Sequence, residues 1–166
     1  FNENTVAILL LNGLGHKERI RKEFKIKLII ATIGSLEVSL NSNRIAIHKT
    51  KSKPFIEMYA NDKSLDETMI FLKNLFDKSS INSQILEDEN NIIWRKLGRL
   101  SVISTMTSMQ NTNIGYVRDD KDLKKIMLEL INDICSVSNK IGIKTNQRDI
   151  LKAIENLPYD LKTSMQ

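Results

Sequence analysis

Residues 5–18 of the chain read TVAILLLNGLGHKE, and this stretch decides how the first half folds. Residues 6–11 form a continuous apolar run that stops at an Asn-Gly pair, and a second glycine follows at position 15. A short apolar run bounded by turn residues is typical of a strand covered on both faces, as in a parallel sheet. The charged residues 16–24 then predict a surface helix, and residues 27–33 predict a second strand. The first unit is therefore β-loop-α-β.

The alternation of strands and helices continues to about residue 88. Residues 44–60 read RIAIHKTKSKPFIEMYA, which predicts two strands joined by a basic turn at residues 49–53, with Pro54 at a strand start or edge. Apolar residues recur at helical spacing over residues 64–76, and Ser64 with Glu67 forms a capping box there. A further short strand is expected within residues 80–88.

Beyond residue 88 the pattern becomes all-helical. Residues 91–109 carry apolar side chains on most sides, which predicts a largely buried helix, and residues 110–116 predict a loop. Asp120 is expected to cap a helix that runs to residue 141, with Gly142 after its end, and a short helix is expected over residues 147–156. The apolar stripe of the capped helix comprises Leu123, Ile126, Leu130, Ile131, Ile134, Val137 and Ile141. We therefore predict an α/β domain over residues 1–88 followed by an all-α domain over residues 89–166.

The composition indicates a soluble globular protein. The 166 residues are 41% hydrophobic and 27% charged, and the longest apolar run has six residues, against about 20 for a bilayer span. With no basic-then-apolar leader, we expect a cytoplasmic protein and no membrane partner. A single cysteine, Cys135, suits a reducing compartment and reads as a core residue. Two histidines without a Cys/His cluster predict no structural zinc site.

The net charge of +5 raises the question of a nucleic-acid partner. The basic residues are spread along the chain, and the aromatic residues, 5% of the total, do not interleave with them. Single-stranded nucleic acids are bound by aromatic platforms within basic grooves, and the sequence lacks that pattern. We expect no nucleic-acid partner.

Three places could carry chemistry. Asn12 and Gly13 follow a strand of an open sheet, where ligands bind, and there the glycine lets the backbone approach a ligand; the alternative is a simple tight turn. Lys96 shares an i, i+4, i+8 stripe with Leu100 and Ser104, which suits proton transfer if the amine is partly desolvated; the alternative is a lysine whose head reaches water. Ser164 follows a helix and is a ligand contact or a helix cap.

Four motifs taken in order resemble the ketopantoate reductase (2-dehydropantoate 2-reductase) family: NGLG after a strand, IIWRKL opening a buried helix, VSNKIGI ending a helix, and LKTSMQ. The resemblance implies the later part of a Rossmann-type NADP-binding domain over residues 1–88, and most of a helical substrate-binding domain over residues 89–166. The family's G-x-G-x-x-G fingerprint would precede residue 1, so the chain resembles a fragment. The helical domain of the family commonly mediates dimer contacts, which allows a homodimer.

The resemblance also implies roles for single residues. Asn12 and Gly13 would lie beside the nicotinamide of NADP(H). Lys96 would be the general acid that protonates the keto oxygen of a 2-oxo acid. Ser164 would contact this small-molecule substrate, and Thr163, in place of the family's first serine, would do similar work.

The chain departs from the family pattern on the stripe that carries the lysine. Leu100 and Ser104 stand where the family has asparagines; the hydroxyl of Ser104 keeps a substrate contact, whereas Leu100 cannot donate a hydrogen bond. The expected function is reduction of ketopantoate or a related 2-oxo acid by NADPH, with the fragment alone inactive. The alternative is a non-catalytic binding or assembly protein, or an inactive relative, on the same fold.

Overall fold

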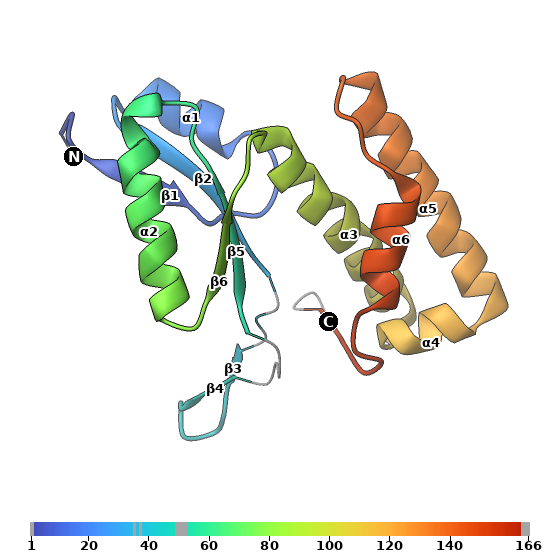
Figure 1. The fold of residues 1–166 in the computed structure, drawn as a ribbon. Coiled ribbons are helices and arrows are strands. Elements are labelled where there is room, and N and C mark those ends of the chain that lie inside the picture. The colour runs from blue at the N-terminus through green and yellow to red at the C-terminus, as the bar shows by residue number, and fades with distance from the viewer. Residues whose placement is uncertain (1, 35, 37, 49–52, 164–166) are drawn as a thin grey trace. The chain divides into compact units, whose positions relative to one another are not determined.

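A computed structural model describes residues 2–34, 36, 38–48 and 53–163 of the protein, apart from the side chain of Asn91. The chain divides into two compact units, Phe1–Ile92 and Ile93–Gln166. The order of elements, α/β and then all-α, confirms the predicted fold class (Figure 1). The first unit contains β1 (Val6–Leu9), α1 (His16–Glu23), β2 (Lys27–Gly34), β3 (Val38–Leu40), β4 (Ala46–His48), β5 (Phe55–Tyr59), a 3-10 turn (Lys63–Leu65), α2 (Asp66–Lys78), β6 (Asn82–Ile85) and the start of α3 (Glu89–Gln110).

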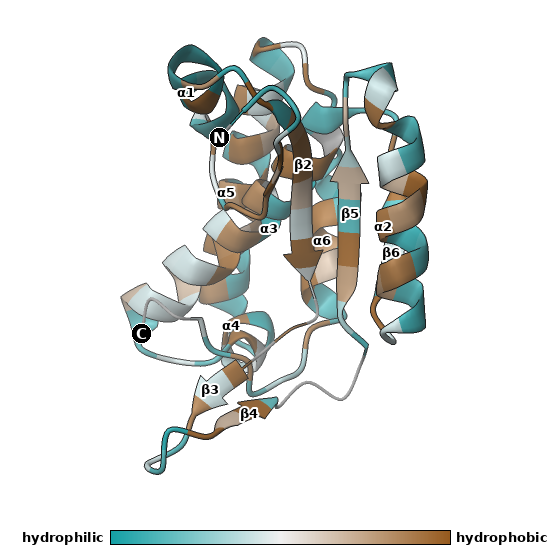
Figure 2. Cartoon of the chain, turned by 90° about the vertical axis from the view of Figure 1, so that its left-hand side faces the viewer, coloured by the Kyte–Doolittle hydropathy of each residue, from teal (hydrophilic) through white to brown (hydrophobic). Residues whose placement is uncertain are grey.

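A four-stranded sheet in the order β1-β2-β5-β6 forms the frame of the first unit. β1 runs parallel to β2, as predicted, while β5 runs antiparallel to β2 and parallel to β6. Residues 28–32 of β2 are all buried, whereas β1 lies at the edge of the sheet in the described part of the chain and is only partly covered. Figure 2 shows β2 as a mostly hydrophobic strand and β5 with alternating bands, as expected for a strand buried on both faces and a strand with two unlike faces.

The two strands predicted within residues 44–60 both exist as β4 and β5, and they lie in different sheets. β4 pairs with β3, a strand the sequence did not indicate, in a separate two-stranded sheet. β5 enters the main sheet because Ile56 and Met58 can be buried there, whereas β4 is exposed throughout. Pro54 directly precedes β5 and its carbonyl accepts from the Asn82 N–H at 2.9 Å, which confirms it at a strand start. Residues 49–52 of the basic turn lie outside the described part.

The capping box proposed for Ser64 and Glu67 is wrong. Asp62, two residues earlier, is the cap: its carboxylate accepts from the Ser64 N–H at 2.9 Å and begins a 3-10 turn. The Ser64 hydroxyl instead accepts from Lys27 Nζ at 2.9 Å. The extra turn carries Leu65 into the core, where it is fully buried, so the requirement to bury Leu65 overrides the local capping pattern.

Asp77 ties the C-terminal end of α2 to β6. Its carboxylate accepts from Lys73 Nζ at 2.5 Å and from the Ser83 hydroxyl and N–H at 2.9 and 3.2 Å. The Lys73 hydrogen bond first, and then those from Ser83, hold the pKa of Asp77 below its ordinary value of 3.8. Because the charged form is the one that is bound in the folded state, the contribution is fully present above pH 3.8 and is lost as the pH falls through the lowered pKa.

We therefore expect Asp77→Asn to be less stable than wild type at neutral pH, with a difference that shrinks as the pH drops below 3.8. Urea unfolding followed by circular dichroism at a series of pH values measures this difference. The most acidic points serve as the internal control, since Asp77 is protonated there in both the folded and the unfolded chain. A difference that does not change with pH would show that the charge of Asp77 is not what stabilises this corner.

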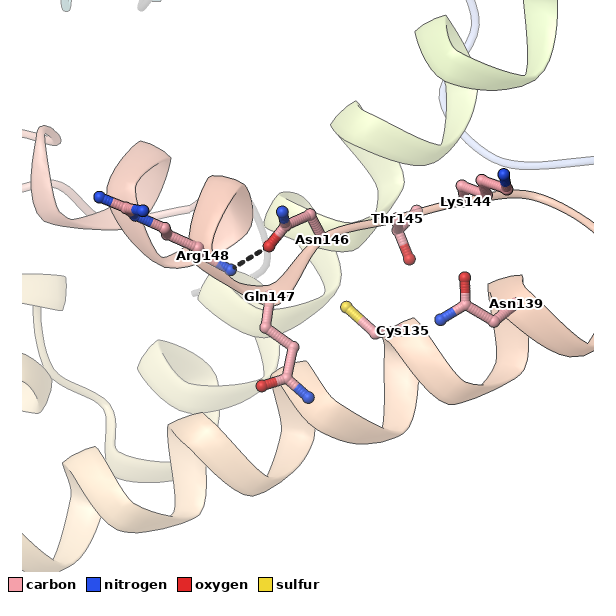
Figure 3. A pocket seen from close by; sticks show the side chains of 7 residues that line it. All are labelled: Cys135, Asn139, Lys144, Thr145, Asn146, Gln147 and Arg148. Atoms are coloured by element: carbon pink, nitrogen blue, oxygen red, sulfur yellow. Dashed lines mark hydrogen bonds between the residues drawn. The ribbon is translucent and has the colours of Figure 1, made fainter.

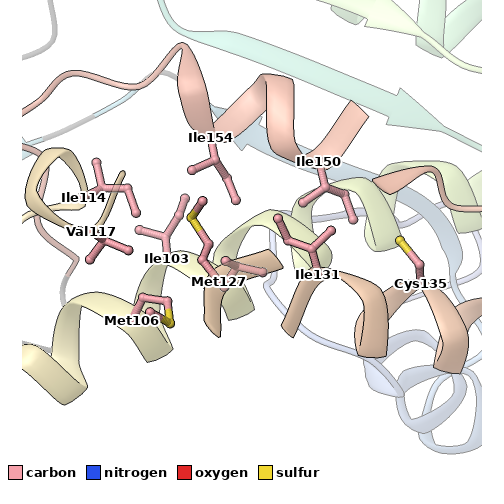
Figure 4. Packing of buried hydrophobic residues seen from close by; sticks show 10 residues of the cluster. Ile103, Met106, Ile114, Val117, Met127, Ile131, Cys135, Ile150 and Ile154 are labelled. Carbon is pink, nitrogen blue, oxygen red and sulfur yellow. The ribbon is translucent and has the colours of Figure 1, made fainter. Parts of the chain in front are cut away.

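Up to residue 163, the second unit consists of four helices: the rest of α3, α4 (Ile114–Asp119), α5 (Lys121–Lys140) and α6 (Gln147–Glu155). Asp120 caps α5 by accepting from the N–H of Asp122 and Leu123, and Gly142 adopts a left-handed φ of 83° beyond its end, as predicted. The α6 helix is also confirmed, with Asn146 as its cap. Figure 4 shows the core between these helices, which contains Val102, Ile103, Met106, Ile114, Val117, Met127, Ile131, Cys135, Ile150 and Ile154.

Two details of the second unit differ from the predictions. The region predicted as a loop contains the start of α4, whose cap is Asn113: its side chain accepts from the Tyr116 N–H at 2.9 Å. Of the predicted stripe, Ile126 and Val137 on α5 and Ile141 just beyond its end are exposed. The remaining members are in the core or packed against it: Leu123, Leu130, Ile131 and Ile134. The buried residues of α5 are Met127, Ile131, Cys135 and Ser138, so the helix turns a face about one residue away toward the core. Cys135 is buried, as predicted.

No helix in the part of the chain that the structure describes is both long enough and apolar enough to cross a membrane.

Candidate functional site

The loop after β1 is shaped by two glycines. Gly13 and Gly15 have φ values of 94° and 84°, in the left-handed region that a residue with a Cβ rarely adopts. A ring nitrogen of His16, Nε2, lies 2.8 Å from the Asn12 carbonyl oxygen and closes the loop. The Asn12 side chain remains exposed. The loop thus presents an amide and a stretch of backbone with no bulky side chain at Gly13 or Gly15.

The N-terminus of α1 begins at this loop. Its cap is Gly15, which provides no side-chain hydrogen bond to the first N–H groups of the helix. Such groups carry partial positive charge and favour an anion. Lys17, in the first turn, forms an ion pair with Glu89, a carboxylate that is 9% exposed at the start of α3. This buried pair was not foreseen, because a charged stretch such as HKERIRKE reads as solvated.

Lys96 lies on α3 and is half-buried, as are Leu100 and Ser104 on the same stripe. Gly98 marks a different side of the helix: a Cβ there would lie 3.0 Å from Ile150 Cδ1. Positions 96 and 98 are about 200° apart on a helix, so Lys96 leaves α3 on the side away from the contact with α6. Removing its side chain therefore leaves the helical core filled.

Thr163 is brought to the far end of the same stripe. Its hydroxyl oxygen lies 3.4 Å from that of Thr107, and either hydroxyl can donate. Thr107 is fully buried and follows Ser104 by three residues, so the two lie on neighbouring turns about 4.5 Å apart along the axis. Lys96 lies about 12 Å from Ser104 along α3 by the same rise. Ser164 is outside the described residues.

Thr107 was missed by the sequence reasoning. A signal existed, because Thr107 extends the stripe of Lys96, Leu100 and Ser104 by one more turn. Asn12 and Gly13 belong to the first unit, whereas Lys96, Ser104 and Thr163 belong to the second.

An open hollow of about 640 Å³ lies beside α5 and the N-terminus of α6 (Figure 3). Two of its polar side chains have partners within the second unit: Asn146 accepts from the Arg148 N–H at 2.8 Å, and Gln147 donates to Asn132 at 2.6 Å. The lining residues are Cys135, Asn139, Lys144, Thr145, Asn146, Gln147 and Arg148. None of the predicted site residues is among them. No group of His, Cys, Asp and Glu side chains within the described ranges is arranged to hold a metal ion.

Residues 88–166 match the family model described as ketopantoate reductase PanE/ApbA C terminal. The 2-dehydropantoate 2-reductase of Streptococcus pyogenes serotype M3 is 22% identical over 152 residues, which is 92% of this chain and 49% of the relative. The enzyme of the same name from serotype M6 is 21% identical over the same shares. The chain thus spans about half the length of the curated relatives it matches.

Solved structures show the same fold. A complex of D-mandelate dehydrogenase with NADH has a TM-score of 0.85 at 16% identity, covering 99% of this chain and 56% of that one. The 2-dehydropantoate 2-reductase from Porphyromonas gingivalis W83 has a TM-score of 0.79 at 16% identity, covering 94% and 54%. A dimeric ketopantoate reductase from Staphylococcus aureus has a TM-score of 0.75 at 20% identity, covering 99% and 54%. Residues 88–166 thus match the C-terminal region of the ketopantoate reductase family, and the curated relatives extend this likeness over 92% of the chain.

Proposed function

We propose that the protein containing this chain reduces a 2-oxo acid, ketopantoate or a relative of it, to the 2-hydroxy acid with NADPH. The observation that carries the proposal is the stripe on α3, where half-buried Lys96 and Ser104 share a face and Thr163 reaches its far end at Thr107. The stripe lies within the residues that match the family model. The curated relatives bear the name of a reductase of this substrate class.

The loop after β1 fits the nicotinamide end of a dinucleotide. Gly13 has no side chain to keep a flat ring away from the backbone, the exposed side chain of Leu14 offers such a ring an apolar contact, and exposed Asn12 provides an amide partner. Bound NADPH supplies a hydride. Asn12 would orient the ring and Gly13 would let it approach the strand end.

Lys96 is proposed as the general acid. As hydride reaches the keto carbon, the carbonyl π bond breaks and its electron pair moves to the oxygen. The Lys96 ammonium gives that oxygen a proton and becomes a neutral amine, so the product carries a hydroxyl. Before the transfer, its positive charge stabilises the negative charge developing on the oxygen. Ser104 and Thr163, which carry hydroxyl donors, are proposed to bind the substrate together with Ser164.

The proposal is tested with the complete protein, because the sequence of this chain contains no G-x-G-x-x-G motif to hold the phosphates of the cofactor. Titration with NADPH and with NADH measures binding, and a series of 2-oxo acids measures turnover. We expect saturable binding of NADPH and oxidation of it by at least one of these acids. Absence of binding would contradict the proposal, and binding without turnover would favour an inactive relative.

Leu100 offers a sharper test of the substrate. It is half-buried on the stripe of Lys96, where the family resemblance implies an asparagine. We expect Leu100→Asn to raise kcat/KM for ketopantoate about tenfold, because the amide adds one hydrogen bond to a polar substrate. Thr105→Asn, which places the same amide at an exposed position of α3, is the matched control and should leave kcat/KM unchanged. An equal response of both variants would show that the missing amide at position 100 is not what limits activity on ketopantoate.

A further inference from the structure

The last described residues of the second unit are bound to the start of α4. The N–H of Gly115 donates to the Tyr159 carbonyl at 2.8 Å, and the N–H of Ile114 donates to the Leu161 carbonyl at 3.1 Å. These two donors lie in the first turn of α4, where amides lack a partner within their own helix. The segment 159–161 therefore takes the place of water at this helix end.

Two further contacts set the path of this segment. Arg118 Nη1 donates to the carbonyls of Ile154, Glu155 and Leu157 at 3.1, 2.7 and 2.9 Å, which closes the C-terminal end of α6 just before the segment begins. A Cβ at Gly115 would lie 2.3 Å from the ring of Tyr159, so this ring can cover α4 only where a side chain is absent. The segment is thus guided from α6 to the far end of the stripe on α3.

Thr107, on α3, lies close to the end of this part of the chain, at Thr163. Its side chain is fully buried, and a buried hydroxyl costs free energy unless it is hydrogen-bonded. Valine has nearly the same shape and would fill the site without that cost. The Thr107 hydroxyl lies 3.4 Å from that of Thr163, 56 residues away in the chain. This contact is polar, and a valine at position 107 could not make it.

We propose that Thr107 is a positioning residue that holds the side chain of Thr163 in one rotamer, and so sets where the Thr163 hydroxyl meets the carboxylate of a 2-oxo acid. The proposal rests on the proposed function, in which Thr163 contacts substrate. Thr107 itself is buried and acts through Thr163. Its loss therefore weakens substrate binding, while the proton transfer from Lys96 continues.

The kinetic test compares Thr107→Val, which removes the hydroxyl and keeps the shape, with Thr107→Ser, which keeps the hydroxyl. In the complete protein we expect Thr107→Val to raise KM for the 2-oxo acid about tenfold with kcat changed less than twofold, and Thr107→Ser to restore KM. Thr105→Val, at an exposed position of the same helix, is the control. Equal KM values for Thr107→Val and Thr107→Ser, or a fall in kcat alone, would overturn the proposal.

A second measurement needs no turnover. Three-bond couplings to the Thr163 methyl group report its rotamer in solution, and exchange of the Ile114 and Gly115 amides reports whether the segment stays bound to α4. We expect one Thr163 rotamer in wild type and Thr107→Ser and several in Thr107→Val, with unchanged amide exchange. A single rotamer in all three proteins, or faster exchange in Thr107→Val, would overturn the positioning role. If the complete protein reduces no 2-oxo acid, the proposed function fails, and the rotamers alone decide the role of Thr107.

Discussion

Replacing Lys96 with alanine in the complete protein is expected to lower kcat by about a thousandfold, with little change in the affinity for NADPH. The loss is large because one ammonium both donates the proton and stabilises the developing alkoxide. The fold should survive, since Lys96 leaves α3 on the side away from the packed contact at Gly98. Steady-state kinetics gives kcat, fluorescence titration gives the NADPH affinity, and thermal unfolding checks the fold.

Lys124→Ala is the matched control for Lys96, because it removes an exposed lysine from a helix of the same unit. We expect wild-type kcat from this variant. If Lys96→Ala also keeps wild-type kcat, then Lys96 is a surface lysine whose head reaches water, and the proton comes from another group. A lower NADPH affinity with unchanged kcat would instead assign Lys96 to cofactor binding.

Ile131→Ala is expected to lower the free energy of unfolding of the second unit by about 2 to 5 kcal/mol. Ile131 is 1% exposed in the core between α3, α5 and α6, so its truncation leaves a cavity as well as removing buried apolar surface. Urea unfolding followed by circular dichroism measures the change. The size of the loss depends on how far neighbouring side chains move into the space.

Ile126→Ala is the matched control for this variant. It makes the same chemical change on the same helix, but Ile126 is 44% exposed, so we expect a loss of less than about 1 kcal/mol. Equal losses from both variants would place Ile126 in the core, on the face that the apolar pattern of α5 first indicated.

The α5 helix shows which part of the fold could be read from the sequence. Its start at Asp120 follows from local chemistry, because a carboxylate that binds the first amides needs only its own neighbours. The buried face of α5 does not follow from local chemistry. Ile126 and Val137 are exposed although they are more apolar than Cys135 and Ser138, which are buried. The choice depends on contacts with α3 and α6, which lie far away in the chain.

Strand pairing in the first unit follows the same division. Local sequence patterns were enough to find β4 and β5. They did not show that β4 pairs with β3, or that β5 lies between β2 and β6. Ser64 likewise carried a correct capping pattern in a place where the burial of Leu65 imposed an extra turn. Local sequence patterns therefore located the helices and strands, whereas the burial of apolar side chains decided which strands pair and how α2 begins.

The candidate site also has one part that could be predicted from the sequence and one part that could not. The stripe of Lys96, Leu100 and Ser104 follows from helical period, and the structure places all three on α3. The contact between Thr107 and Thr163 joins residues 56 positions apart, and no periodicity connects them. Only the packing of the segment 159–161 against α4 reveals it.

The binding of residues 159–161 to α4 also bears on how the protein is made. The chain leaves the ribosome from its N-terminal end, so α3, α4 and α5 emerge before their partners at Tyr159 and Leu161. Until then the N–H groups of Ile114 and Gly115 lack these two carbonyl partners. The helical unit therefore cannot complete these contacts until residues 159–161 have been made, and a ribosome that stops before Tyr159 releases a unit that has its helices but lacks the hydrogen bonds that close the start of α4.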